Sequence, residues 1–353
     1  MPAMTMRQRM LNLVRGEEVD RVPFVTYSGC AAPDEEVWKL IGRDQMGLLR
    51  WTMPYRLERP NCPAVEEPIA RDGLEGRRTT IETPRGTLVS ERFFEPTYHT
   101  ASISRHFVTE PDQYSALLAY FQDTVVVPDF EIVPQVRAEL GDDGLALVRV
   151  DRTPYQQLWV QWVSIDDLVL HLADCPDRVE ACVAALGDVQ RRIFDVIDRV
   201  GAEFVDFPDN ITAPMIGERY FRRYCAPWYD ELAGRLGDDV PVYVHMDGDL
   251  KPLWEAIGQT RVRGLDSLSP PPDNDTSPGD VVSMWPEMRI WINFPSSIHL
   301  APAEQVYATT MGFMEQAGHS GRFQIQISEN VPPFAWRTSY PEIVRAIRDF
   351  GDA

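Results

Sequence analysis

Residues 241–248, Pro-Val-Tyr-Val-His-Met-Asp-Gly, form a short apolar run that ends in a histidine, an aspartate and a glycine. A run of this length that is apolar on both faces is typical of a parallel strand covered on both sides. We therefore predict a strand over residues 241–245, with His245 at its carboxyl end.

The same pattern continues on both sides of this strand. A helical pattern over residues 217–236 precedes it, and another covers residues 177–200. Short apolar segments alternate with amphipathic ones along most of the chain, as in a parallel sheet with crossover helices. Eight such segments predict a (β/α)8 TIM barrel, an α/β fold, with the predicted helices in its outer ring. The predicted strands are residues 22–27, 48–53, 146–151, 203–207, 241–245, 262–268, 289–294 and 323–328.

Two segments depart from this alternation. Thr5 and Gln8 have the spacing of a capping box, and Gly16 ends the helical pattern that follows, so we expect an N-terminal helix that closes the bottom of the barrel. Residues 78–83 and 88–94 flank Pro84-Arg85-Gly86 as two strands flank a turn. We predict a β-hairpin insertion after strand 2, at about residues 70–106, within one barrel domain over residues 1–353.

The charge balance excludes some partners. The 353 residues include 54 acidic and 34 basic ones, giving a net charge of -20. This charge disfavours nucleic acid and anionic membranes as partners. We also find no export signal, no apolar run of membrane-spanning length and no CxxC pair among the five cysteines. These features predict a cytoplasmic protein with reduced thiols.

Three sequence segments resemble the uroporphyrinogen decarboxylase-like superfamily. They are the stretch from Arg7-Gln-Arg9 to Pro23, the stretch from Ile216 through Pro227-Trp-Tyr229, and His245-Met-Asp-Gly248. The superfamily includes the heme-pathway decarboxylase and corrinoid-dependent methyltransferases. The resemblance implies a single barrel, homodimerisation, and either methyl transfer or decarboxylation.

The segment after strand 1 differs from that of the decarboxylases. Those enzymes carry Met-Arg-Gln-Ala-Gly-Arg there, and the arginines hold the carboxylates of the substrate. This chain has Tyr-Ser-Gly-Cys-Ala-Ala at residues 27–32. A ligand with many carboxylates needs several cationic partners, so we do not expect porphyrinogen decarboxylation.

The methyltransferase motif is also changed. The resemblance implies a zinc site made by His-x-Cys-Gly and a second cysteine near the last strand. Here His245 matches the histidine, while Asp247 and Glu329 stand in place of the two thiolates. One imidazole and two carboxylates suit zinc, manganese or iron, so we expect His245, Asp247 and Glu329 to bind a divalent metal. The alternative is a hydrogen-bonded His–Asp pair with carboxylates that cap helices.

Other polar residues follow the predicted strands, and such residues converge on one mouth of a barrel. Asp206 and Asp209 flank an apolar Phe-Pro pair, and burial can raise a carboxyl pKa into the range of a general acid or base. Capping of a helix is the alternative role for both. With Tyr27 and His245 they are our catalytic candidates. The residues expected to bind substrate are Arg152, Tyr155, Asn210, Asn293 and Trp336.

These features favour a methyltransferase-like enzyme. It would move a methyl group between a small or aromatic substrate and a corrinoid or tetrahydropterin carrier, with any corrinoid protein supplied as a separate chain. The first alternative is a decarboxylase in which Arg152 holds a non-porphyrin carboxylate. The second is a barrel that binds a tetrapyrrole without catalysis.

Overall fold

The computed structural model describes residues 4–96, 100–329, 331–332 and 334–351. The chain divides into two compact units. The first, called the barrel unit, consists of Met1–Pro54, Phe130–Arg149 and Val200–Ala353. The second unit consists of Tyr55–Asp129 and Val150–Arg199. That residues 1–353 act as one domain stays a prediction.

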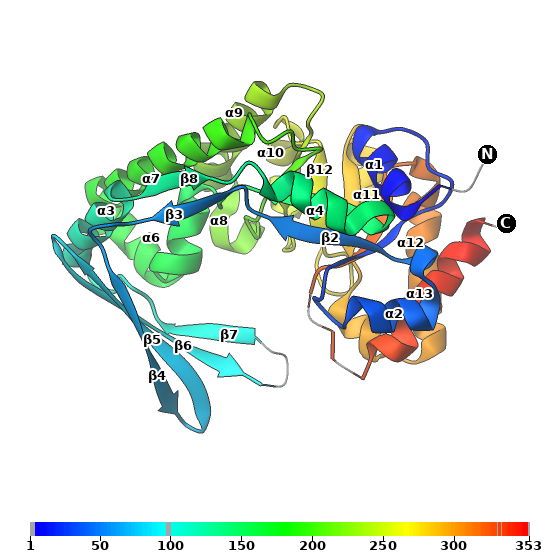
Figure 1. The fold of residues 1–353 in the computed structure, drawn as a ribbon, viewed down its shortest axis with the longest axis horizontal. Coiled ribbons are helices and arrows are strands. Elements are labelled where there is room, and N and C mark those ends of the chain that lie inside the picture. Colours follow the sequence, from blue (N-terminus) through cyan, green and yellow to red (C-terminus); the bar gives the residue numbers. More distant parts are fainter. Residues whose placement is uncertain (1–3, 97–99, 330, 333, 352–353) are drawn as a thin grey trace. The chain divides into compact units, whose positions relative to one another are not determined.

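Eight parallel strands close into a barrel in the first unit, which confirms the (β/α)8 prediction (Figure 1). Their order around the barrel is β1-β14-β13-β12-β11-β10-β9-β2. Each of the eight predicted segments contains or overlaps one of these strands, with ends that differ by a few residues. The strands are β1 (Phe24–Tyr27), β2 (Gly47–Thr52), β9 (Gly144–Arg149), β10 (Val205–Phe207), β11 (Val242–His245), β12 (Gly264–Leu268), β13 (Arg289–Asn293) and β14 (Phe323–Ile327).

Helix α1 (Met6–Arg15) begins at the predicted capping box, in which Thr5 accepts from the backbone of Gln8 and Gln8 accepts from Thr5. Gly16 ends it in the left-handed region, at φ 77°. The apolar face of α1 packs against side chains that point into the barrel. This buried core contains Met6, Met10, Leu13 and Val14 of α1 with Val25, Tyr27, Leu49, Leu145, Leu147, Phe204, Tyr243 and Trp291.

One predicted helix is interrupted. Residues 217–236 do not form a single helix, because Gly217 is non-helical at φ 61° and ψ 159° and a π-helical turn covers Phe221–Cys225. Two helices, α8 and α9, therefore replace it. The helices of the barrel unit otherwise match the expected strand–helix alternation. They are α2 (Asp34–Ile41), α4 (Ile132–Leu140), α8 (Ala213–Tyr220), α9 (Ala226–Leu236), α10 (Trp254–Gly258), α11 (Pro278–Met284), α12 (Ala303–Ala317) and α13 (Trp336–Gly351).

The second unit contains two antiparallel sheets. The predicted turn at Pro84–Gly86 joins β5 to β6, and β4 and β7 extend this hairpin to a four-stranded sheet in the order β4-β5-β6-β7 (Figure 1). Residues 97–99 of the predicted insertion lie outside the described part of the chain. The predicted helix over residues 177–200 forms α7 (Pro176–Ile197), which belongs to this unit. The remaining elements are β3 (Tyr55–Glu58), β4 (Ala64–Arg71), β5 (Leu74–Thr83), β6 (Gly86–Glu95), β7 (Thr100–Arg105), β8 (Val125–Pro128), α3 (Tyr114–Gln122), α5 (Pro154–Gln157) and α6 (Ile165–Asp174).

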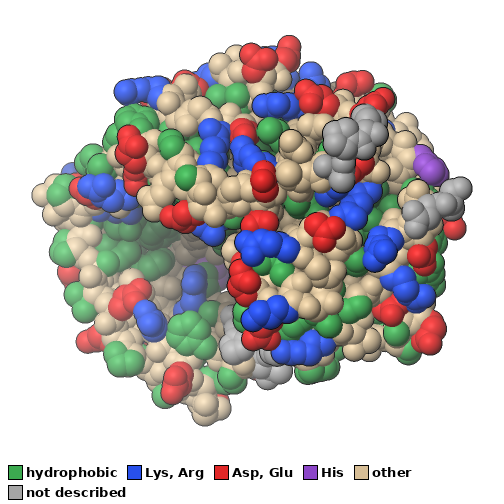
Figure 2. Space-filling view, turned by 45° about the vertical axis from the view of Figure 1, so that its right-hand side comes forward, with side chains coloured by type: hydrophobic (Ala, Val, Ile, Leu, Met, Phe, Trp, Pro, Cys, Tyr) green, Lys and Arg blue, Asp and Glu red, His purple; other side chains and the backbone are tan. Residues whose placement is uncertain are grey.

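The surface carries both signs of charge. Figure 2 shows acidic and basic side chains intermingled on the face in view. Several of the arginines pair with neighbouring carboxylates, such as Arg43 with Asp143 at 2.7 Å and Arg50 with Glu139 at 2.6 Å. Among the described helices, none has the length and apolar character needed to cross a membrane.

Candidate functional site

A polar layer lies above the apolar core at the carboxyl ends of the barrel strands. Side chains alternate along a strand, so the residue two positions after an inward-pointing core residue also points inward. Leu147, Phe204 and Tyr243 belong to the buried core. The next inward positions on β9, β10 and β11 are therefore Arg149, Asp206 and His245. Apart from Arg149, which is partly buried, these polar side chains are less than 10% exposed.

His245 is held between two carboxylates. Its Nδ1 lies 3.3 Å from Oδ2 of Asp266 on β12, and its Nε2 lies 3.5 Å from Oδ2 of Asp247. The residue is 9% exposed. A histidine that binds a metal through one ring nitrogen usually donates from the other nitrogen to a carboxylate or carbonyl. Asp266 is placed for this second role, which leaves Nε2 directed toward Asp247.

Asp266 is itself fixed by two further hydrogen bonds. Tyr27 donates to its Oδ2 at 2.5 Å, and Nε2 of Gln326 donates to its Oδ1 at 2.8 Å. The next residue, Ser267, has φ 62°, a left-handed conformation that is uncommon for serine. The pairing of β12 with β13 shifts register here, and the Ser267 hydroxyl lies 3.3 Å from Tyr27 Oη. The irregular end of β12 thus directs two consecutive polar side chains into the same network.

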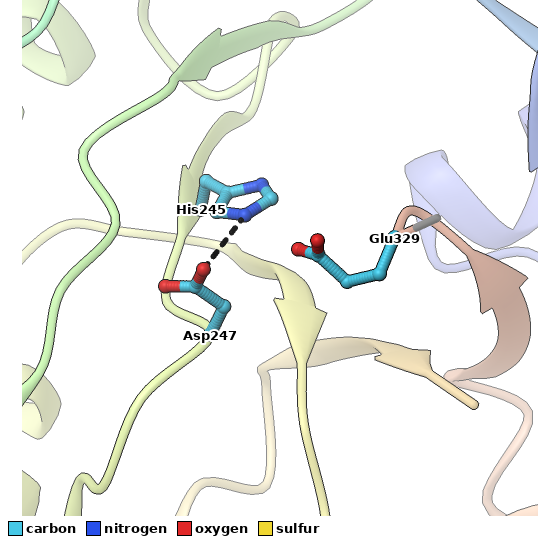
Figure 3. A group of neighbouring side chains, drawn as sticks. All are labelled: His245, Asp247 and Glu329. Carbon is cyan, nitrogen blue, oxygen red and sulfur yellow. Dashed lines mark ion pairs between the residues drawn. The ribbon is translucent and has the colours of Figure 1, made fainter. Parts of the chain in front are cut away.

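Glu329 completes a cluster of possible metal ligands with His245 and Asp247. One ligand atom from each residue lies within 4.8 Å of the others. Glu329 follows β14. Figure 3 shows its carboxylate directed toward His245, at the end of β11, and toward Asp247, in the loop after β11. Two ligands at about 2.1 Å from a tetrahedral ion lie roughly 3.4 Å apart, and the 3.5 Å between His245 and Asp247 is close to this value. The donor set therefore fits a divalent ion.

The loop after β11 is fixed by its neighbours. Nδ2 of Asn210 donates to Oδ2 of Asp247 at 2.8 Å, and Nδ2 of Asn274 donates to the Asp247 carbonyl at 2.7 Å. A Cβ on Gly248 would lie 2.1 Å from Cβ of Thr212, so only glycine permits this close approach. Asn210, predicted to bind substrate, orients Asp247 in this structure.

The titratable groups of the site differ in the direction in which their pKa values are shifted. Burial alone would lower the pKa of His245, but the hydrogen bonds and negative charges of Asp247 and Asp266 outweigh burial and raise it well above its usual value. Burial would raise the pKa of Asp247 and of Asp266, but contact with His245 lowers both. In the absence of a metal, the site therefore holds a protonated imidazole between two ionised carboxylates.

The pKa of Asp206 is shifted in the direction opposite to that of Asp247 and Asp266. It is 1% exposed, its Oδ2 lies 3.9 Å from Nε of Arg149, and its Oδ1 has no hydrogen-bond partner among the described residues. Burial, and then the negative charge of Asp266, raise the pKa of Asp206 well above its usual value, although Arg149 and His245 oppose this shift. A carboxyl group whose pKa is raised holds its proton more readily and can act as a proton donor.

Two other predicted residues have structural partners. Asp209 is completely buried and accepts a hydrogen bond of 2.5 Å from Tyr229 of α9. Asn293 is 2% exposed, and its Oδ1 accepts from the Ser328 amide at 3.1 Å. These contacts favour positioning roles for both residues.

The remaining substrate-binding candidates are Trp336, in α13 of the barrel unit, and Arg152 and Tyr155, in the second unit. Trp336 is 3% exposed and packs near Tyr340 in α13, so its ring is closed to a planar ligand. Helix α13 begins at Trp336 and buries this side chain, which the sequence predicts to bind substrate. Arg152 and the fully buried Tyr155 belong to the second unit, and their roles in binding stay predictions.

Sequence reasoning missed the roles of three residues at the site, Arg149, Asp266 and Gln326. Alternation along the strands could have identified each, because all three lie two positions after another inward-facing residue. The missed signal for Asp266 was a carboxylate within a predicted buried strand, since an ionised side chain is rarely buried without partners.

A sequence profile described as Uroporphyrinogen decarboxylase (URO-D) matches residues 163–349, which is more than half of the chain. The chain belongs to the uroporphyrinogen decarboxylase family. The match confirms the resemblance that the three sequence segments indicated. Membership of this family agrees with the closed barrel, but a shared fold does not determine the reaction.

Two solved structures provide further comparisons. A methyltransferase from Methanosarcina mazei aligns over 98% of this chain and 99% of its own, with a TM-score of 0.59 and 14% sequence identity. Identity this low shows a shared fold only. A putative vitamin-B12 independent methionine synthase from Listeria monocytogenes aligns over 65% of this chain and 70% of its own, with a TM-score of 0.40 and 12% identity. A search of curated protein sequences finds no match.

Proposed function

We propose that the chain is a methyltransferase-like enzyme that transfers a methyl group between a small or aromatic substrate and a corrinoid or tetrahydropterin carrier. The observation that carries the proposal is the cluster of His245, Asp247 and Glu329. Asp266 contacts Nδ1 of His245, on the other side of the ring from Nε2, and orients the imidazole. The fold shared with a methyltransferase is consistent with it. A separate corrinoid protein as partner and a homodimeric state belong to the same proposal.

The cluster would hold a divalent zinc, manganese or iron ion through Nε2 of His245 and the carboxylates of Asp247 and Glu329. A bound ion supplies Lewis-acid polarisation of the substrate atom that gives up or receives the methyl group. Asp266 orients the imidazole, and Asn210 orients Asp247. Asp206, whose pKa is raised by burial, supplies a proton to the atom that loses the methyl group.

Metal binding tests the proposal directly. We expect purified protein to bind one zinc, manganese or iron ion, and Glu329→Ala to lower metal affinity more than about tenfold because it removes a ligand. Glu304→Ala, which removes an exposed carboxylate from α12, serves as the control. Replacing both Asp247 and Glu329 by cysteine should shift selectivity toward zinc, since thiolates favour softer ions.

The role of Asp266 is tested with a second pair of variants. Asp266→Asn should lower metal affinity by about 10- to 100-fold, as loss of a carboxylate behind a ligand histidine does. Asp209→Asn removes a buried carboxylate that contacts Tyr229 and serves as the control. Equal losses in the two variants would point to general destabilisation of the barrel and would contradict the proposed support of His245.

The transfer step is measured with free cobalamin. We expect methylcobalamin to form from cob(I)alamin and a methylated donor, with most of the rate lost in Glu329→Ala. No metal binding and no methyl transfer over a panel of methyl ethers and amines would overturn the proposal. Stoichiometric binding of a coloured tetrapyrrole without turnover would instead favour a non-catalytic barrel.

A decarboxylase is the second candidate function. The pairing of a neutral Asp206 with Arg149 favours it, because the arginine could hold a carboxylate while Asp206 protonates the carbanion left by loss of carbon dioxide. Carbon dioxide release from a non-porphyrin acid, abolished by Asp206→Asn and independent of metal, would support this candidate.

A further inference from the structure

An exposed tryptophan, which is not a member of the metal-ligand cluster, lies at the mouth of the barrel. Trp51 follows the core residue Leu49 by two positions on β2, so alternation places its side chain on the inner face of the strand, above the core. Yet Trp51 is 56% exposed. Large aromatic side chains usually bury most of their surface, so an exposed indole at a barrel mouth calls for an explanation.

The Trp51 ring is held in a fixed orientation. The guanidinium of Arg149 lies over the ring at 4.2 Å from its centroid, and Tyr27 packs edge-on at 5.2 Å with an interplanar angle of 67°. Arg149 is in turn close to Asp206. A ring that is supported by a cation on one face and exposed elsewhere is ready to stack against a flat ligand at little entropic cost.

A cavity of about 430 Å³ adjoins Trp51. Its lining comes from Tyr27 at the end of β1, residues 28–30 of the loop that follows, and residues 49–51 of β2. The loop after β1 forms one wall of the cavity and is held in position by two hydrogen bonds. Asp34 accepts from the Ser28 hydroxyl at 2.7 Å and from the Gly29 amide at 3.0 Å. This volume lies within the range of sites for small organic ligands and suits a compound of one or two rings better than a tetrapyrrole.

The cavity adjoins the metal-ligand cluster through Tyr27. The phenol oxygen of Tyr27, a lining residue, lies 3.3 Å from Nδ1 of His245. His245 and Glu329 in turn offer ligand atoms that lie within 4.8 Å of each other. A ring in this cavity would therefore lie on the side of the cluster that Tyr27 contacts.

We propose that Trp51, supported by Arg149, is the stacking platform of a subsite for a one- or two-ring aromatic substrate that carries its methyl group toward His245 and Glu329. The cation on one face of the indole draws electron density from it, so the other face favours an electron-rich ring such as a methoxybenzene. This inference rests on the proposed function and names its substrate class.

Binding to metal-free protein tests the subsite apart from catalysis. Titration calorimetry with 2-methoxyphenol, after dialysis against a chelator, should show binding that weakens about tenfold or more in Trp51→Ala and only a few-fold in Trp51→Phe, which keeps a ring for stacking. Met53→Ala, which removes an exposed side chain just beyond β2, should leave binding unchanged. Cyclohexyl methyl ether, of similar size but not flat, should bind much more weakly.

The outcomes separate this inference from the proposed function. Trp51-dependent binding of 2-methoxyphenol without any methyl transfer would support the subsite and contradict the methyltransferase. Methyl transfer from aliphatic donors, with kcat/KM unchanged in Trp51→Ala and no binding of 2-methoxyphenol, would overturn the subsite and leave the methyltransferase standing. Circular dichroism of each variant confirms that it is folded.

Discussion

Single residues in this protein show how burial changes the chemistry of a side chain. Asp206 and Asp266 both lie in the polar layer of the barrel and are almost inaccessible to solvent. Asp266 contacts His245 and accepts from Tyr27 and Gln326, so its charge is compensated. Asp206 has Arg149 at 3.9 Å and the charge of His245 as its cationic neighbours, but burial outweighs them and favours its neutral form. Partners, rather than residue type, decide which carboxyl group can carry a proton.

His299 provides a pH prediction at this scale, away from the site. It is 3% exposed, its Nδ1 lies 2.7 Å from the Ser339 hydroxyl, and burial lowers its pKa to about 3. As pH falls, the unfolded chain binds the proton first, so the free energy of unfolding decreases between about pH 6.5 and pH 3. The loss between pH 6.5 and 5 should reach about 2 kcal/mol.

Urea unfolding at pH 7 and pH 5 measures this effect. His299→Gln removes the titrating group, so its stability should depend less on pH than that of the wild type, whatever the cost of the substitution at pH 7. His319→Gln, at an exposed position, is the control. A His299→Gln variant that loses as much stability as the wild type on acidification would contradict the assignment.

At the scale of elements, the site depends on loops that pack closely after neighbouring strands. Gly248 donates from its amide to the Ile211 carbonyl at 3.1 Å, and Ile211 donates to the His245 carbonyl at 3.3 Å. These bonds tie the loop after β11 to the loop after β10. Asp247 and Asn210 therefore keep their relative positions through backbone contacts as well as their own hydrogen bond.

Gly248→Ala should destabilise the protein by about 1–3 kcal/mol, because the new Cβ would overlap Thr212 and force the two loops apart. Gly312→Ala is the matched control, since a Cβ there meets nothing within 4 Å in helix α12. That substitution should be neutral or stabilise by up to about 1 kcal/mol. Urea midpoints measure both, and a Gly248→Ala variant as stable as the wild type would disprove the close packing.

At the scale of the whole molecule, the dominant feature is the net charge of -20. Exposed ion pairs contribute little each, typically about 0–1 kcal/mol, whereas repulsion among excess carboxylates opposes the compact state as a sum over the chain. Salt screens this repulsion, because the Debye length falls from about 30 Å at 0.01 M to about 8 Å at 0.15 M ionic strength.

We therefore expect the free energy of unfolding to increase when sodium chloride is raised from 0.01 to 0.15 M at pH 7. Unfolding in urea, with divalent metals removed beforehand, measures the change. Potassium chloride should have the same effect if screening is the cause. A fall in stability over this range would show that specific ion pairs outweigh the repulsion.

The sequence by itself determined the barrel. Each buried strand, such as residues 241–245, carries a local pattern of apolar side chains that requires no knowledge of its neighbours. The capping box at Thr5 and the turn at Pro84–Gly86 are likewise local signals. The sequence also placed His245, Asp247 and Glu329 together, since strand ends converge in a closed barrel.

Only the tertiary structure decided which other residues join them. Asp266 and Gln326 contact each other across strands that are far apart in the sequence, and the register shift in β12 that turns Ser267 inward has no local signature. Trp336 is the tryptophan that the sequence predicts to bind substrate, yet it is buried in α13, whereas Trp51, within the predicted strand over residues 48–53, is exposed at the barrel mouth. Alternation along the strands can mark Asp266 and Gln326 as inward-facing, but the burial and the partners of a side chain depend on neighbours that folding brings together. Those partners could be assigned only once the barrel had closed.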